Sequence, residues 1–228
     1  MLDVTSVSEP TAERIVVGSN RIAVPWVLGL YALAGATFVV AARMAGWYGS
    51  SDSRFLLLPF AAVLGGLTQL LAGMWAFEAE DTLATAMLGI WGSFWIGYGI
   101  LQGLFLSGRL MEPAGPFREL GFWFIPLALI TWVGAAAARS AALAVTLVFL
   151  AAGASIAAIA NISMHGGLMI LAGWLFIISS VLAWYTATAM MFETTAGHQV
   201  WPLGRLRGWR IARATTIPGP APAAHRAG

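Results

Sequence analysis

Three amide side chains are the main groups that could do chemistry within the apolar stretches of this chain: Gln69, Gln102 and Asn161. Gln102 follows Trp91 by eleven residues, and Asn161 follows Leu150 by eleven residues. Eleven residues bring a helix almost back into register, so each amide is expected on nearly the same face as the earlier residue. An unpaired amide in hydrocarbon costs roughly 2–7 kcal/mol, so these groups should face partners or water. The alternative role for each is a hydrogen bond that holds two helices together.

Groups typical of an enzyme or a metal centre are absent from the sequence. No Asp or Glu falls in the middle of an apolar stretch, and the chain has neither cysteine nor a Gly-x-Ser-x-Gly motif nor a phosphate-binding loop. His165 lies near a predicted membrane interface, where a solvated end residue is more common than a proton shuttle. We therefore expect no catalytic residue, no metal ligand and no cofactor, and the chain is not expected to be an enzyme.

Composition indicates that the chain lies in a lipid bilayer. Of its 228 residues, 59% are hydrophobic and 10% are charged, and the mean hydropathy is +0.80. Soluble domains carry about 25% charged residues. The formal net charge of +2 is too small to indicate a nucleic-acid partner. Membrane lipid is therefore the expected environment.

The hydropathy pattern predicts an all-α membrane protein with six transmembrane helices, since a crossing helix needs about 20 apolar residues. The expected spans are 24–45, 55–77, 83–106, 120–138, 141–163 and 166–192. Fusing the fourth and fifth would give five spans, but Arg139 would then lie in lipid at high cost. Around the membrane domain at 24–192, we expect a polar cytoplasmic segment at 1–23. A basic, Pro/Ala-rich and disordered cytoplasmic tail is expected at 193–228.

Arginines predict the orientation. With an even number of spans both chain ends lie on one side, and arginine is enriched on the cytoplasmic side of membrane proteins. The side with the ends carries Arg14, Arg21, Arg139, Arg205, Arg207, Arg210 and Arg213, and the opposite side carries Arg43, Arg54, Arg109 and Arg118. Both termini are therefore expected in the cytoplasm, with the chain in the cell (inner or plasma) membrane.

Two sequence runs resemble a known family. Residues 65–75 read GGLTQLLAGMW and residues 91–95 read WGSFW, with an acidic turn between them. Small residues let membrane helices approach closely. Together the runs resemble the second and third helices of the acetate uptake transporter family (YaaH-like, succinate–acetate transporters). Asn161-Ile162 and residues 172–174 are similar to its later spans, so that the resemblance covers about residues 24–192.

The first span is similar to the family signature Asn-Pro-Ala-Pro-Leu-Gly-Leu. Val24 stands in place of the Asn, and Val27 in place of the second Pro. The positions that agree are Pro25, Leu28, Gly29 and Leu30. The resemblance implies a six-helix protomer that assembles into a homo-hexamer, with a separate path for small monocarboxylates in each protomer.

The resemblance also implies where the path is narrow. In the family three bulky residues, typically Phe, Tyr and Leu, form a hydrophobic constriction, and the matching positions are Leu33, Trp91 and Leu150. A neutral acid crosses such a neck more cheaply than its carboxylate. We expect Leu33 and Leu150 to exclude water, while Gln69, Asn161 and Trp91 donate to the carboxylate. Gln102 is a further expected polar contact.

The expected function is transport of acetate or a similar short-chain monocarboxylate, with succinate as a further substrate and a proton as the co-substrate. Whether this is proton symport or a channel stays open. A channel for a neutral solute such as urea, an amide or ammonia is an alternative, because the spans hold no central basic residue. A second alternative is a membrane sensor or assembly subunit that transports nothing.

Overall fold

The computed structural model describes residues 23–49 and 53–205. Within these residues six helices are long and apolar enough to cross a membrane, and no strand is present. The predicted all-α membrane fold with six crossing helices is confirmed. The elements are α1 (Pro25–Met44), α2 (Ser53–Phe60), η1 (Ala61–Thr68), α3 (Gln69–Glu78), α4 (Thr82–Leu106), α5 (Arg118–Ala137), α6 (Ala141–Ile162) and α7 (Gly166–Ala196).

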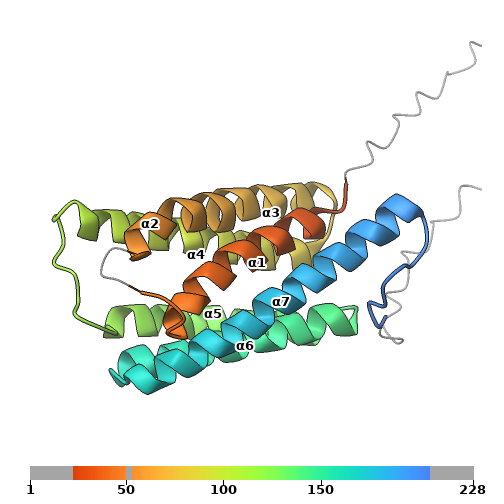
Figure 1. The fold of residues 1–228 in the computed structure, drawn as a ribbon. Helices are drawn as coiled ribbons and strands as arrows, with labels where there is room; N and C mark the ends of the chain where they lie inside the picture. The colour runs from red at the N-terminus through yellow and green to blue at the C-terminus, as the bar shows by residue number, and fades with distance from the viewer. Residues whose placement is uncertain (1–22, 50–52, 206–228) are drawn as a thin grey trace, which may run out of the picture.

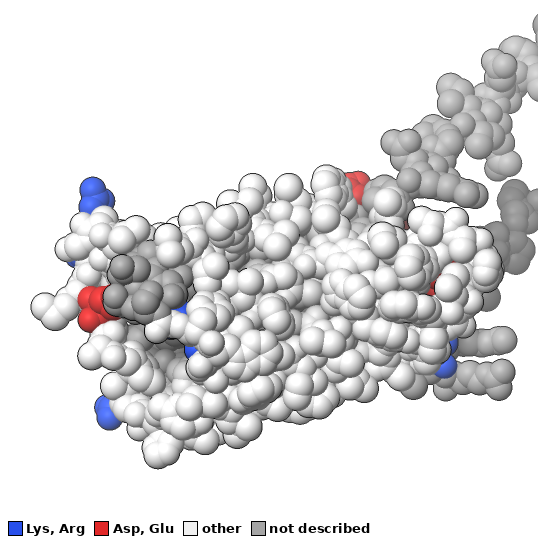
Figure 2. All heavy atoms as spheres, viewed as in Figure 1, with Lys and Arg blue, Asp and Glu red and all other residues white. Residues whose placement is uncertain are grey.

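The helices form one bundle in which the second crossing helix comprises α2, η1 and α3. Figure 1 shows the helices running along a common long axis, with the start of α1 and the end of α7 at the same end. α1 packs against α7, α7 against α6 and α6 against α5, while α3 packs against α4. On the face shown in Figure 2, charged side chains gather at the two ends and leave the flank uncharged. An uncharged flank suits hydrocarbon, and the chain is a multi-pass membrane protein.

The first turns of α1 and α4 are tied together. α1 starts with Pro25, whose missing N–H would have no partner at a helix start in any case. Asp81 caps α4, because one of its carboxylate oxygens accepts a hydrogen bond from the Ala84 N–H at 3.0 Å. Its other oxygen accepts from the Trp26 indole N–H at 2.8 Å. The two helices therefore start at the same depth.

Glycines bring the second crossing helix close to α4. A Cβ atom on Gly73 would lie 2.9 Å from the backbone nitrogen of Gly89, and one on Gly92 would lie 2.6 Å from the backbone nitrogen of Leu70. Real Cβ atoms do not come so near to backbone, so only glycine allows this spacing. The glycine run of the sequence is thus a helix-packing face, as small residues commonly are in membranes.

The second crossing helix differs from a uniform α-helix by its π-helical segment η1. Pro59 lies two residues before it and lacks the N–H that an α-helical hydrogen bond needs. Inside the segment, the Thr68 hydroxyl donates to the Val63 carbonyl at 3.2 Å, five residues back. π-helical turns are rare and frequently occur at functional sites.

Residues 193–205, the described start of the expected tail, form the end of α7 and a segment that is hydrogen-bonded to α6. α7 continues to Ala196, so the tail boundary expected at residue 193 falls inside this helix. Residues 197–205, here called the C-terminal strap, turn back along the bundle. The N–H groups of Ala141 and Ala142 donate to carbonyls of the strap at 2.7 and 3.1 Å. These bonds satisfy donors that the first turn of α6 leaves free.

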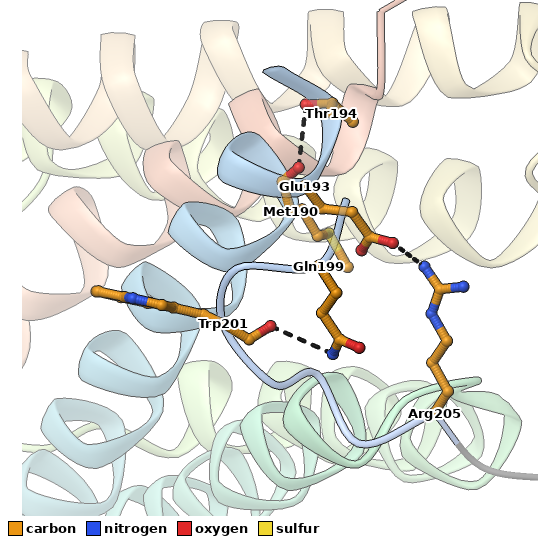
Figure 3. Close-up of polar contacts among 6 residues, drawn as sticks. All are labelled: Met190, Glu193, Thr194, Gln199, Trp201 and Arg205. Carbon is orange, nitrogen blue, oxygen red and sulfur yellow. Dashed lines mark hydrogen bonds and ion pairs between the residues drawn. The ribbon is translucent and has the colours of Figure 1, made fainter. Parts of the chain in front are cut away.

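Side chains hold the C-terminal strap in place, as Figure 3 shows. The Arg205 guanidinium forms an ion pair with the Glu193 carboxylate near the end of α7. The Gln199 amide donates to the Trp201 carbonyl at 3.3 Å. The Trp201 ring stacks on Tyr185 with centroids 5.4 Å apart. The rest of the expected tail, 206–228, and the expected N-terminal segment up to residue 22 lie outside the described residues.

Candidate functional site

A cavity of about 650 Å³ occupies one half of the bundle. All six crossing helices contribute to its lining. The second crossing helix contributes through α2 and through Ala61 of η1. Its outer rim is formed by the turn at 46–49 and the loop at 112–117, both of which contain exposed residues. The cavity therefore opens at the end of the bundle opposite the start of α1, and we call it the vestibule.

Aromatic rings close the inner end of the vestibule. The Trp91 ring contacts Phe94 and Phe176 edge-on, with centroids 5.6 and 6.3 Å apart. Phe94 also contacts Phe124, at 5.4 Å. The Trp91 indole N–H donates to the Thr131 hydroxyl at 3.1 Å, so its donor is occupied in this conformation. The vestibule thus ends on a rigid aromatic floor.

Four buried polar atoms of vestibule-lining residues have no hydrogen-bond partner. Across residues 23–49 and 53–205, five buried side-chain polar atoms lack one, and the fifth belongs to Gln69. The four that line the vestibule are Thr37 Oγ1, Arg43 Nε, Trp95 Nε1 and Gln102 Oε1. Native proteins leave few buried polar groups unpaired, and such groups in a cavity indicate water or a polar ligand.

Asn161 lines the vestibule, but both the oxygen and the nitrogen of its amide form hydrogen bonds to the backbone. Its Nδ2 donates to the Ala157 carbonyl at 2.8 Å, and its Oδ1 accepts from the Phe117 N–H at 3.1 Å. The second bond satisfies a backbone donor at the start of α5 and holds the end of the rim loop 112–117. Asn161 therefore positions the mouth of the vestibule, with one amide hydrogen left for a solute.

The three residues expected at the constriction lie at similar depth. Leu33, Trp91 and Leu150 are eight, nine and nine residues after the first residues of α1, α4 and α6. These three helices run in the same direction, so each residue lies about 12–14 Å along its helix. All three are at most 2% exposed and belong to one hydrophobic cluster. Trp91 lines the vestibule, whereas the two leucines lie outside its lining.

The remaining residues predicted from the sequence lie away from the vestibule. Gln69 is buried at 1% exposure, in the first turn of α3, and is not part of the lining. The signature residues form the first turns of α1, where Gly29 packs against Leu88 and Leu30 is fully buried. The signature therefore serves the packing of α1 and α4 at the closed end of the bundle. Its other members are Pro25, which is buried, and Leu28, which is exposed.

Sequence reasoning missed three of the four vestibule residues that carry an unpartnered polar atom, although a signal for two of them existed. Thr37 follows Leu33 by four residues, and Trp95 follows Trp91 by four, so each lies one turn further along the same helix face. Arg43 in the last turn of α1 also lines the vestibule, so the spans do present a basic residue to the cavity.

The turn after α1 places a neutral phenol beside this arginine. Burial raises the pKa of the Tyr48 hydroxyl, and the Arg43 guanidinium offsets part of that shift. The phenol therefore stays protonated near neutral pH and donates to the Val39 carbonyl. At the rim, Arg43 is thus the group that favours an anion.

Comparison with known proteins places these features in a family context. The sequence profile of the GPR1/FUN34/yaaH family matches residues 9–206. The succinate-acetate/proton symporter SatP of Escherichia coli is 24% identical over 82% of this chain and 98% of its own length. The ammonia transport outward protein 2 of Saccharomyces cerevisiae is 30% identical over 75% of this chain and 62% of its own. The glyoxylate pathway regulator of Yarrowia lipolytica is 30% identical over 57% of this chain.

The chain spans 49% and 62% of the lengths of these two yeast relatives. Among solved structures, that of the bacterial acetate channel SatP matches with a TM-score of 0.73 at 22% identity, covering 81% of this chain and all of that one. This likeness supports the six-helix fold.

Proposed function

Because this chain belongs to the GPR1/FUN34/YaaH family, we propose that it carries acetate or a similar short-chain monocarboxylate across the membrane. It is a transporter and not an enzyme. The observation that carries the proposal is the vestibule, where four unpartnered buried polar atoms meet an aromatic floor. Relatives named as a succinate-acetate symporter and an acetate channel support the substrate class, and succinate is a further candidate.

The proposed path runs from the vestibule through a closed hydrophobic neck. Leu33, Trp91 and Leu150 are buried at similar depth, and the described vestibule does not pass beyond Trp91. An isolated carboxylate in such a neck carries a prohibitive desolvation cost, whereas the neutral acid does not. We therefore expect the acid to cross together with a proton. Gln69, Gln102 and Asn161 are the proposed polar contacts along the way.

The three amides differ in whether they can contact a solute in the vestibule. Gln102 presents an unpartnered carbonyl to the vestibule, and Asn161 keeps one amide hydrogen free there. Gln69 has an unpartnered carbonyl outside the vestibule lining, so it would contact a solute only when the neck opens. Trp91 would donate to a solute only after its bond to Thr131 breaks.

The proposed assembly is a homo-hexamer in the cell membrane with both termini in the cytoplasm. The start of α1 and the end of α7 lie at one end of the bundle, so the two described ends share a side. Under this orientation the vestibule opens to the outside, and the C-terminal strap lies on the cytoplasmic side.

A pH series of labelled-acetate uptake into proteoliposomes tests the proposal. Carboxylic acids have pKa values near 4, so between pH 7 and pH 6 the neutral fraction rises about tenfold. Uptake is expected to rise with it. Uptake that is independent of pH would contradict passage of the neutral acid, and a channel for a neutral solute would then remain. The relative named as an ammonia transport protein makes ammonia the solute to test in that case.

A double substitution tests the neck. Trp91→Ala with Leu150→Ala should widen it and raise the uptake of a four-carbon acid relative to acetate. Trp123→Ala with Leu129→Ala is the matched control, because both of these side chains are more than half exposed on the outer surface of α5. Equal uptake ratios in the two double variants would refute the assignment of the neck. Absence of flux for every solute in the wild type would leave a sensor or assembly subunit.

A further inference from the structure

Two residues with unpartnered polar atoms, Arg43 and Gln102, line the vestibule at a similar level near its mouth. We propose that Arg43 and Gln102 form a binding subsite for short acids that carry a hydroxyl group beside the carboxylate, such as hydroxyacetate. In this subsite the guanidinium binds the carboxylate, and the Gln102 carbonyl accepts a hydrogen bond from the hydroxyl. The inference rests on the proposed function, because it specifies which acids the same vestibule prefers.

Helix geometry places the two groups at one level. The hydrogen bond between Trp26 and Asp81 fixes the starts of α1 and α4 at the same depth. Arg43 lies 18 residues into α1 and Gln102 lies 20 residues into α4, which is about 27 and 30 Å along the helices. Both residues line the vestibule, and both carry a buried polar atom without a partner.

Chemical complementarity argues for a hydroxyl. An ionised monocarboxylate offers only hydrogen-bond acceptors. It can satisfy the Arg43 guanidinium but not the Gln102 carbonyl, which belongs to a side chain only 7% exposed. Leaving a buried acceptor unpaired is costly. A hydroxyl next to the carboxylate supplies the missing donor from the same small molecule.

The deeper polar pair has a different preference. Thr37 and Trp95 lie about 18 and 20 Å along α1 and α4, roughly 10 Å below the mouth pair. Both can donate hydrogen bonds, so a plain carboxylate satisfies both of them. A short acid cannot span both levels at once. Selection for the hydroxyl is therefore made at the mouth, before the acid reaches the aromatic floor.

Binding of three acids to the full chain in detergent tests the subsite. The rise in Tm with ligand concentration gives an apparent Kd for each acid. Hydroxyacetate and propionate have the same number of heavy atoms and differ by a hydroxyl in place of a methyl group. At pH 7, where both are ionised, hydroxyacetate is expected to bind about fivefold more tightly than propionate, the effect of one hydrogen bond. Acetate serves as the reference acid.

Variants test whether Gln102 causes the preference for hydroxyacetate over propionate. Gln102→Leu should bring the Kd ratio of propionate to hydroxyacetate close to one. Gln199→Leu is the same substitution in the C-terminal strap, remote from the vestibule, and should keep the wild-type ratio. If Gln102→Leu unfolds in detergent, Arg43→Gln replaces it and should weaken the binding of all three acids.

The outcomes separate this inference from the proposed function. Equal Kd values for hydroxyacetate and propionate in the wild type would overturn the subsite, even where acetate uptake is found. A preference that survives Gln102→Leu would overturn the role of Gln102. Tight hydroxyacetate binding without uptake of any acid would support the subsite and overturn transport.

Discussion

Because Gly92 packs closely against the second crossing helix, adding one methyl group at this position should lower the free energy of unfolding substantially. In Gly92→Ala the new Cβ would lie 2.6 Å from the backbone nitrogen of Leu70 and 3.1 Å from the carbonyl oxygen of Gly66. Both are backbone atoms, so no side-chain rotation relieves the contact. Normal carbon contacts are about 3.5–4.0 Å, and the two helices must separate by about 1 Å. Overpacking of this kind costs about 1–3 kcal/mol.

The same helix offers a control of opposite sign. A Cβ on Gly103 meets nothing within 4 Å, so Gly103→Ala adds no contact. Alanine is favoured over glycine within a helix by about 0.5–1 kcal/mol. Gly92→Ala and Gly103→Ala should therefore differ in the free energy of unfolding by about 1.5–4 kcal/mol, with opposite signs relative to the wild type.

Thermal unfolding of the full chain in detergent, followed by circular dichroism of the helices, measures this difference. The variants are compared at one protein and detergent concentration, because assembly makes Tm depend on concentration. A Tm for Gly92→Ala equal to or above that of Gly103→Ala would refute the close packing of α4 on the second crossing helix.

Three further substitutions test other parts of the structure. Asp81→Ala removes the cap of α4 and the acceptor of the Trp26 indole, and should lower the free energy of unfolding by about 2 kcal/mol, measured by the same unfolding method. Arg43→Gln should lower acetate uptake about threefold to tenfold at low ionic strength and less at high salt, because salt screens the attraction of an anion by a charge. An equal loss of uptake at low and at high ionic strength would contradict this attraction. Glu193→Gln breaks an ion pair whose Arg205 side chain is 68% exposed, and should change stability by less than about 1 kcal/mol.

The helices could be predicted from the sequence because hydropathy and length are local properties. All six expected spans correspond to observed helices, with ends that differ by a few residues. The π-helical segment could not be predicted, since Pro59 lies within a long apolar run that reads as one ordinary helix. The continuation of α7 was also missed. Residues 193–196 are helical and Glu193 pairs with Arg205, and that contact depends on how the strap folds back.

The candidate site was only partly accessible to sequence reasoning. Gln102 and Asn161 were expected to face one path, and both line the vestibule. The sequence could not show that the Asn161 side-chain oxygen accepts a hydrogen bond from the Phe117 N–H, because these residues are 44 positions apart. Arg43 was counted with the charges of the side opposite the termini, because it lies two residues from the end of the expected span 24–45, and its place in the vestibule lining was not foreseen. Such contacts follow from tertiary packing and not from local pattern.

The distribution of satisfied polar groups distinguishes the two halves of the bundle. Toward the closed end, the Thr146 and Thr186 hydroxyls lie 3.2 Å apart, and the Ser179 hydroxyl donates to the Thr146 carbonyl at 3.0 Å. Around the vestibule, four buried polar atoms lack a protein partner. Native proteins leave few buried polar groups unpaired, so the cluster of four around the vestibule makes this half the one suited to water and solute. The proposed neck lies at the boundary between these halves, and we infer that the solute gives up its remaining water there.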